Sequence, residues 1–526
     1  MTTAARAARA CARRPHARRR AIAALLLCTI AAPATADLTG SNLVEFQSGN
    51  YPFRDPENRF DLYDQLDLQY AAPTLRVGVR LEINENSENL YTYREFTQRW
   101  AEWSDERLRL RVGNFHTILG RGLLHRSFEL PGVVLDELGI RARYAPSRDV
   151  DGVLAEGRAG PVDARLFAGQ PNGGVHSPAA EEFGLERYQG QLAGGQTAVA
   201  VYRQARIGAA YLRASNEQGA PREFGSGFVE LDPALLAGVD AFALPVYVEY
   251  AQANRDFGDF FRFRTGDRDT FALYAGANLL WGPFGLAAEW KDYRGFRLGF
   301  NDPPSLVREH AFALLNRNTH VLDAERERGF QLEGSWTVDA WGTATLNASR
   351  SDGEGDRYEE LYGELHAMPP GAPWEATLFM SGGLDEFDFT ARRRAWGGAG
   401  SLRVLGSWAV SVDVQKQDAT RRFFTLPPES FGDLYASAGV SRGGWGSAAL
   451  VVERSTDPQQ EDPDDFAEPG TQPRVFLAGV LNAVISERHQ ATLFVGERRG
   501  GRACTAGTCY EVQPFKGAEL RLTSRF

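Results

Sequence analysis

Charged side chains that recur at every second position are the feature of this sequence most able to do chemistry. Arginine supplies almost all of the positive charge, because lysine occurs only at positions 291, 416 and 516. The planar guanidinium group binds carboxylates and phosphates through paired hydrogen bonds, so a row of arginines around a polar space can select an anionic or sugar-acid solute. The alternative is that these arginines pair only with acids of the same chain. The candidate lining residues are Arg76, Arg80, Glu82, Arg107, Arg109, Arg111, Arg141, Arg143, Glu289, Glu519 and Arg521.

Patterns typical of catalysis or of metal binding are weak in this sequence. Glu309 and His310 are adjacent and His320 follows, but no nucleophile is paired with them. An acidic stretch at 457–468 could bind calcium, yet it lacks the fixed spacing of a calcium loop and is predicted to be a solvated loop. The sequence therefore predicts no enzymatic activity, no catalytic residue, no cofactor and no metal site.

Two nearby cysteines, Cys504 and Cys509, remain once an N-terminal segment at 1–36 is set aside. A nearby pair of cysteines outside the cytoplasm is typical of a disulfide, whereas a metal site would need further ligands close by. We therefore expect a disulfide between them.

The elements that carry these residues are strands, because the hydrophobic pattern has a period of two. In residues 75–83, for example, aliphatic side chains alternate with arginine, glycine and glutamate. Such a segment has one apolar face and one polar face, as expected for a wall that separates lipid from a polar lumen. The same alternation predicts strands at 60–70, 75–83, 93–103, 107–112, 138–144, 162–168, 199–202, 207–211, 246–250, 271–281, 286–290, 330–336, 344–348, 361–365, 376–380, 410–414, 434–440, 448–452, 491–495 and 515–526.

Both ends of the chain bear on where this wall would lie. Residues 1–36 carry seven arginines, an apolar run and then small residues, which is the order of a cleaved secretory signal peptide. The last strand, 515–526, has an apolar face and ends on Phe526. It resembles the C-terminal signal of bacterial outer-membrane β-barrels, although Ser524 departs from the usual large apolar residue. That resemblance implies insertion by the barrel-assembly machinery into outer-membrane lipid.

The connections between strands support a barrel. Short and long connections alternate in the C-terminal half, and outer-membrane barrels have short periplasmic turns and longer outside loops. Five tryptophans lie at or beside the short turns, as in an aromatic girdle at a membrane interface. The alternation fails between Gly113 and Gly195, which indicates a missed or an extra strand there. The tryptophans are Trp281, Trp341, Trp374, Trp408 and Trp445.

Two stretches break the strand pattern. Residues 113–131 have no clean period and are predicted to be an ordinary long loop, with a fold close to the wall as the alternative. In residues 302–320, Asp302 and Pro303 suit a helix start, and helical spacing continues to Asn316. We expect that helix inside the barrel or over its mouth, where Arg308, Glu309, His310 and Arg317 form a candidate constriction. The runs VGNFHTILGRGLLHRS and DPPSLVREHAFALLNRNTH resemble stretches of an uncharacterised group of large outer-membrane barrels, a resemblance that implies no particular activity.

Taken together, these patterns predict an all-β chain. Residues 37–526 would form a single transmembrane antiparallel β-barrel of about 22 strands, with 18–26 possible, and a short helical segment in a long loop. Without residues 1–36 the net charge is −17, so nucleic acid is not an expected partner. The predicted function is passive, porin-like passage of small polar solutes, with anions as one option. The alternative is a structural, secretion or docking barrel without an open pore, and the sequence leaves the oligomeric state undetermined.

Overall fold

The computed structural model describes residues 36–50, 59–87, 91–137, 142–188, 190–202, 205–215, 221–254, 261–264, 269–296, 298–423, 426–458, 473–505 and 507–526. Apart from Ala36, the predicted signal peptide lies outside the described residues, and so do Arg141 and most of the acidic stretch 457–468. Among the helices that the structure describes, none is long and apolar enough to cross a membrane.

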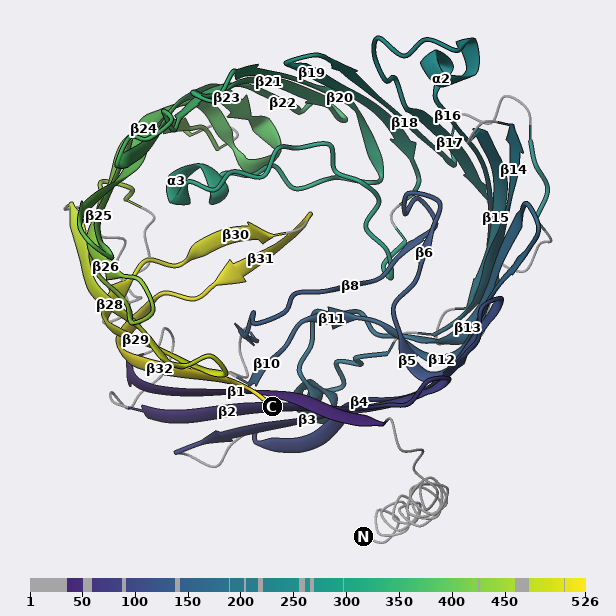
Figure 1. The fold of residues 1–526 in the computed structure, drawn as a ribbon, viewed down its shortest axis with the longest axis horizontal. Helices are drawn as coiled ribbons and strands as arrows, with labels where there is room; N and C mark the ends of the chain where they lie inside the picture. Colours follow the sequence, from purple (N-terminus) through teal and green to yellow (C-terminus); the bar gives the residue numbers. More distant parts are fainter. Residues whose placement is uncertain are drawn as a thin grey trace, which may run out of the picture.

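Twenty-four antiparallel strands form one closed ring (Figure 1). Each strand pairs with the next wall strand along the chain, and β1 pairs with β32 to close the ring. The wall strands are β1 (Asp37–Asn50), β2 (Arg59–Ala71), β3 (Leu75–Asn86), β4 (Tyr93–Ser104), β5 (Leu108–Phe115), β12 (Val150–Ala159), β13 (Val162–Pro171), β14 (Gln191–Tyr202), β15 (Ala205–Ser215), β16 (Pro221–Leu231), β17 (Val246–Ala253), β18 (Phe271–Trp281), β19 (Phe284–Arg294), β20 (Arg326–Val338), β21 (Gly342–Asp352), β22 (Arg357–Ala367), β23 (Trp374–Asp385), β24 (Thr390–Leu405), β25 (Trp408–Arg421), β26 (Glu429–Arg442), β27 (Gly446–Ser455), β28 (Arg474–Ser486), β29 (His489–Arg498) and β32 (Phe515–Arg525).

The alternation of side chains sorts each strand into an inner and an outer face. In β25, Val410, Val412 and Val414 are exposed on the outside, whereas Gln415 and Gln417 are buried on the inside. A closed ring leaves no unpaired strand edge, so all backbone groups of the wall can be satisfied within the sheet. The predicted all-β antiparallel barrel is confirmed, and the predicted number of about 22 strands is close to the 24 observed.

Val412 offers a test of this assignment of faces. An arginine on the lipid-facing side near the bilayer midplane costs about 2–4 kcal/mol, because its charge has no partner in hydrocarbon. We therefore expect Val412→Arg to lower the free energy of unfolding in lipid vesicles by that amount. Ser411→Arg, on the opposite face of the same strand, should have a much smaller effect, and equal losses would show that the faces are reversed.

The two ends of the barrel differ. The start of β1 at Asp37 and the last residue, Phe526, lie at the end with the short connections, where the backbone of Phe526 pairs with that of Gly40. The five predicted girdle tryptophans are exposed at this same end, each at or next to a short turn. Apart from residues 232–245, the longer connections lie at the opposite end, and three of them fold back into the ring.

The described parts of these three connections are called the first, second and third inner segments: residues 116–137 and 142–149, residues 295–296 and 298–325, and residues 499–505 and 507–514 (Figure 1). The first contains β6 (Ile118–Leu119), β7 (His125–Arg126), β8 (Phe128–Glu129), β9 (Leu135–Asp136), β10 (Arg143–Tyr144) and β11 (Ser147–Arg148). The second contains α3 (Ala313–Asn316), and the third contains the hairpin of β30 (Gly501–Thr505) and β31 (Thr508–Val512). The remaining short elements are η2 (Pro178–Phe183), α2 (Pro233–Ala237) and η3 (Glu386–Asp388).

Two local predictions are wrong, both in the inner segments. The helix expected from Asp302 to Asn316 is a single turn, α3, because its predicted start is held elsewhere. The Asp302 carboxylate accepts from Arg148 Nη1 at 2.7 Å, and the Pro304 carbonyl accepts from the Tyr293 hydroxyl at 2.9 Å. Leu306 then takes a positive φ of 55°, which a right-handed helix excludes.

The strand expected at 138–144 is not part of the wall. Its described part contributes only β10, which pairs with β9 inside the ring. The wall strand that follows β5 is instead β12, which had no clean alternation, because Leu154 on its inner face is fully buried under the first inner segment. The failure of the loop pattern between Gly113 and Gly195 thus reflects both a missed and an extra strand.

Candidate functional site in the barrel lumen

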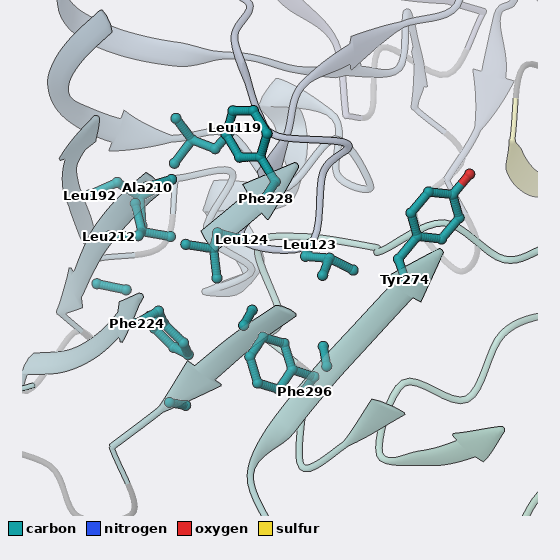
Figure 2. Close-up of a cluster of buried hydrophobic side chains, with 14 of the residues drawn as sticks. Leu119, Leu123, Leu124, Leu192, Ala210, Leu212, Phe224, Phe228, Tyr274 and Phe296 are labelled. Atoms are coloured by element: carbon teal, nitrogen blue, oxygen red, sulfur yellow. The ribbon is translucent and has the colours of Figure 1, made fainter. Parts of the chain in front are cut away.

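Part of the lumen is occupied by an apolar core of buried side chains (Figure 2). Leu119, Leu123 and Leu124 of the first inner segment pack against inward-facing wall residues such as Leu212 and Phe228. Burying such side chains contributes about 1.5–3 kcal/mol each, so this core anchors the segment firmly. The stretch 113–131, predicted to be an ordinary loop, is therefore a packed part of the interior, in line with the alternative of a fold close to the wall.

Gly120 shows how closely this segment approaches the wall. Its N–H donates to Gln196 Oε1 at 2.6 Å, and the next N–H, of Arg121, donates to Glu249 Oε2 at 2.9 Å. A Cβ at position 120 would lie 2.3 Å from the Glu249 carboxylate, and the φ of Gly120, +57°, also favours glycine.

His125 of the same inner segment is fully buried. Burial, together with the positive charges of Arg148 and His116, lowers the pKa of His125 to about 3, so its imidazole is neutral.

Hydrogen bonds and an ion pair to buried wall carboxylates hold the second inner segment against another part of the wall. His310 hydrogen-bonds with Glu360 of β22 at 3.0 Å, and the same carboxylate pairs with Arg393 of β24. Farther along, Arg317 pairs with Glu453 of β27, with Nη2 and Oε2 2.9 Å apart. The segment is therefore fixed at several points along its length.

A second buried cluster lies where this segment rejoins the wall. His320 contacts Asp385 at 3.0 Å and Glu327 at 3.2 Å, and Glu327 also pairs with Lys291. Burial alone lowers the pKa of His320, but hydrogen bonds to Asp385 and Glu327, together with their charges, outweigh burial and raise the pKa above its ordinary value. A protonated His320 accordingly favours docking of the segment, and this contribution is lost as the pH rises through the raised pKa of His320.

The third inner segment is a disulfide-closed hairpin. Cys504 and Cys509 are bonded, as predicted. Cys504 and the Asn316 side chain exchange two hydrogen bonds, of 2.8 and 3.0 Å, which join the hairpin to the second segment. Arg126 Nη2 donates to the Gly507 carbonyl at 3.0 Å, which joins the hairpin to the first segment. The Asn301 side chain of the second segment hydrogen-bonds to the backbone of residues 122, 123 and 126 in the first segment. All three inner segments are therefore connected to one another.

The space left between the hairpin and the wall is a pocket of about 190 Å³. Its charged lining has both signs, and much of it is paired. Arg143 and Arg521 both contact Glu45, which is fully buried. The pocket is lined by Glu45, residues 132–136, Arg143, Arg498, residues 510–513, Glu519 and Arg521.

The structure distributes the predicted lining residues over several places. Arg107 lies exposed in the short turn between β4 and β5, Arg143 lies on β10 of the first inner segment, and Arg141 is outside the described residues. The other eight project inward from the wall, namely Arg76, Arg80, Glu82, Arg109, Arg111, Glu289, Glu519 and Arg521.

Most of the inward arginines have an acidic partner. Arg80 pairs with Asp67 at 2.7 Å, and Arg109 pairs with Glu102 at 2.7 Å and with Glu156 at 2.8 Å. These contacts match the alternative that the arginines pair with the chain's own acids. They remove the main argument for a preference for anions.

The candidate constriction residues all lie in the second inner segment. Arg308 pairs with Glu333, Glu309 accepts from the Gly507 backbone, and His310 and Arg317 hold the wall carboxylates described above. His310 and His320 thus serve separate clusters. In the described part of the chain, no group of three or more His, Cys, Asp or Glu residues is placed to hold a metal ion.

Sequence reasoning missed the apolar core of the lumen and the role of the hairpin as a connector. Aromatic residues on otherwise polar faces, such as Phe167 on the same face as Asp163 and Arg165, were the available signal for the core. Asn301, Asn316 and Gly507 gave no signal, because hydrogen bonds between distant loops leave no local pattern.

A closed ring of strands with an apolar outer belt and a polar or filled interior defines a transmembrane β-barrel of the outer-membrane type. Residues 33–158 match a family of unknown function, DUF6029. No curated protein matches the chain.

Several solved structures are similar to the chain at low sequence identity. The P pilus usher (PapC) translocation pore is 11% identical with a TM-score of 0.47, covering 93% of this chain and 99% of its own. The outer membrane protein opdK from Pseudomonas aeruginosa is 10% identical with a TM-score of 0.40, covering 69% and 96%. A BenF-like porin from Pseudomonas fluorescens Pf-5 is 7% identical with a TM-score of 0.34, covering 93% and 98%.

Proposed function

We propose that this chain is an outer-membrane channel of narrow bore that passes small polar solutes passively. The observation that carries the proposal is the lumen pocket between the disulfide hairpin and the wall, lined by charged side chains of both signs. An unfilled ring of 24 strands would leave a wide aqueous hole, so inward segments that fill most of it would turn a general pore into a selective one. The proposed function involves no catalysis, cofactor or nucleic acid.

The location belongs to the same proposal. Export through a signal peptide at residues 1–36 and insertion by the barrel-assembly machinery through Phe526 would bring the barrel to the bacterial outer membrane. The pairing of Phe526 with Gly40 across the seam gives the last residue a structural role as well.

A second candidate function is a docking or secretion barrel whose pore stays shut. The buried contacts of the second inner segment favour it, because a segment fixed by His310, Arg317 and His320 is not easily displaced. A shut barrel and a narrow channel differ in one measurable property, which is conduction by the purified protein alone.

Planar-bilayer recording of the purified chain tests the channel. We expect small, steady conductance steps, and we expect Glu511→Lys in the pocket lining to shift the reversal potential in a salt gradient toward anions, because it reverses a charge beside the path. Glu487→Lys makes the same change at an exposed short turn and should leave the reversal potential unchanged. A correctly assembled protein that never conducts would overturn the channel and favour the shut barrel.

A further inference from the structure

A cluster of basic side chains projects from the outer face of the barrel near its long-loop end. Arg392 and Arg394 of β24, Lys416 of β25 and Arg454 of β27 point outward, because their neighbours along each strand point into the lumen. Arg393 between the first two is buried against Glu360, and Glu453 before Arg454 is buried against Arg317.

The strand register gathers these side chains into adjacent rows. Lys416 lies opposite Trp396 on one side and Leu434 on the other, and Leu434 lies opposite Arg454. One row nearer the loops, Arg394 lies opposite Asp418. Since neighbouring strands are about 4.8 Å apart and alternate residues about 6.8 Å apart, one headgroup can reach several of these cations.

The rows of outward side chains between the basic cluster and the short-turn end of the barrel are apolar. Val414, Ala436 and Val452 form the next row toward the short-turn end, followed by Val412, Ala438 and Leu450. Several of these aliphatic side chains are exposed, as expected of a belt that faces lipid chains. Trp396, which is also exposed, lies in the first basic row, where indole suits the boundary between headgroups and hydrocarbon.

The cluster carries charge that the described residues do not neutralise. Lys416 pairs with Asp418 at 3.3 Å, whereas the side chains of Arg392, Arg394 and Arg454 have neither an ion pair nor a hydrogen bond within the described part of the chain. Other outward arginines of the wall are paired, for example Arg94 with Glu85 at 2.6 Å. Around the cluster lies an open depression of about 540 Å³, lined also by Ser430 and Thr456.

We propose that this basic patch, formed by Arg392, Arg394, Lys416 and Arg454, binds the phosphate-bearing headgroup of a membrane lipid. Guanidinium groups donate paired hydrogen bonds to phosphate oxygens, and hydroxyls such as that of Ser430 add neutral donors. The acyl chains of the same lipid lie along the apolar rows below. Continuity between the basic rows and the belt selects a lipid over a free anion, and this site is independent of whether the lumen conducts.

Binding of phosphatidic acid to the purified barrel in neutral detergent, followed by native mass spectrometry, tests the patch. The probes are phosphatidic acid, diacylglycerol with the same chains, and inorganic phosphate. We expect tight binding of phosphatidic acid only. The triple variant Arg392→Gln, Arg394→Gln and Arg454→Gln should bind it about 100-fold more weakly, because each cation near an anionic surface contributes about a fivefold factor.

The matched control removes three outward arginines elsewhere: Arg94→Gln, Arg213→Gln and Arg328→Gln. It should bind phosphatidic acid as the unchanged chain does. Lys416→Gln alone should weaken binding about fivefold, which keeps the test valid if the triple variant assembles poorly. If both triple variants lose the same affinity for phosphatidic acid, the binding depends on the overall positive charge of the barrel and not on this patch. If diacylglycerol binds as tightly as phosphatidic acid, the apolar belt alone accounts for lipid binding. If inorganic phosphate binds as tightly as phosphatidic acid, the patch is a site for free anions. Each of these results overturns the proposal.

Discussion

Replacing residues 304–318 with a short Gly/Ser linker is expected to raise the single-channel conductance several-fold. The replacement removes α3 and the contacts of the second inner segment with Glu360, Gln415 and Glu453, and it leaves the hairpin without its partner Asn316. A ring of 24 strands is wide enough to conduct freely once its interior is cleared. The measurement is planar-bilayer recording of protein that shows heat-modifiable migration.

The wall should survive this change. The segment joins β19 to β20, and these strands pair directly over their whole length, from Phe284 opposite Trp336 to Arg294 opposite Arg326. The Lys291–Glu327 pair, which would be costly to break, stays intact. Replacing 233–239, around α2 at the short-turn end, is the matched control and should leave conductance unchanged. An unchanged conductance in the first variant would place the narrowest point elsewhere, beside the first inner segment.

The barrel itself was predictable because the membrane imposes a local rule. A wall strand between lipid and a polar lumen must alternate apolar and polar side chains, so β25 and β26 can be recognised from their own residues. The same rule explains why the tryptophans beside short turns pointed to one end of the ring. Neither inference needs knowledge of any distant part of the chain.

The interior was not predictable by that rule, since the inner segments replace water on part of the lumen face. Leu154 is apolar on the inner side because Leu123 and its neighbours cover it, so β12 loses the expected alternation. The helix expected after Asp302 fails for a related reason. Arg148, Lys291 and Tyr293 donate hydrogen bonds to the residues where the helix was expected to begin. Such long-range partners cannot be recognised from local spacing.

Glu360→Gln is expected to be among the most destabilising single substitutions in the lumen. The Glu360 carboxylate is buried and pairs with Arg393, while His310, Ser381 at 2.7 Å and Tyr358 at 3.1 Å also bond to it. Removing one partner of a buried ion pair leaves the other charge uncompensated, at a cost of about 3–5 kcal/mol. Urea unfolding of the barrel from lipid vesicles measures this loss of unfolding free energy.

Glu364→Gln is the matched control, since Glu364 lies four residues along the same face of β22. Its side chain is 23% exposed and its nearest guanidinium, that of Arg308, is 4.0 Å away, so its loss should cost less than about 1 kcal/mol. Adding Arg393→Met to Glu360→Gln removes the stranded cation and should restore most of the stability. The explanation fails if the double variant is no more stable than Glu360→Gln alone. The loss of stability would then come from the broken hydrogen bonds to His310, Ser381 and Tyr358, and not from the uncompensated charge of Arg393.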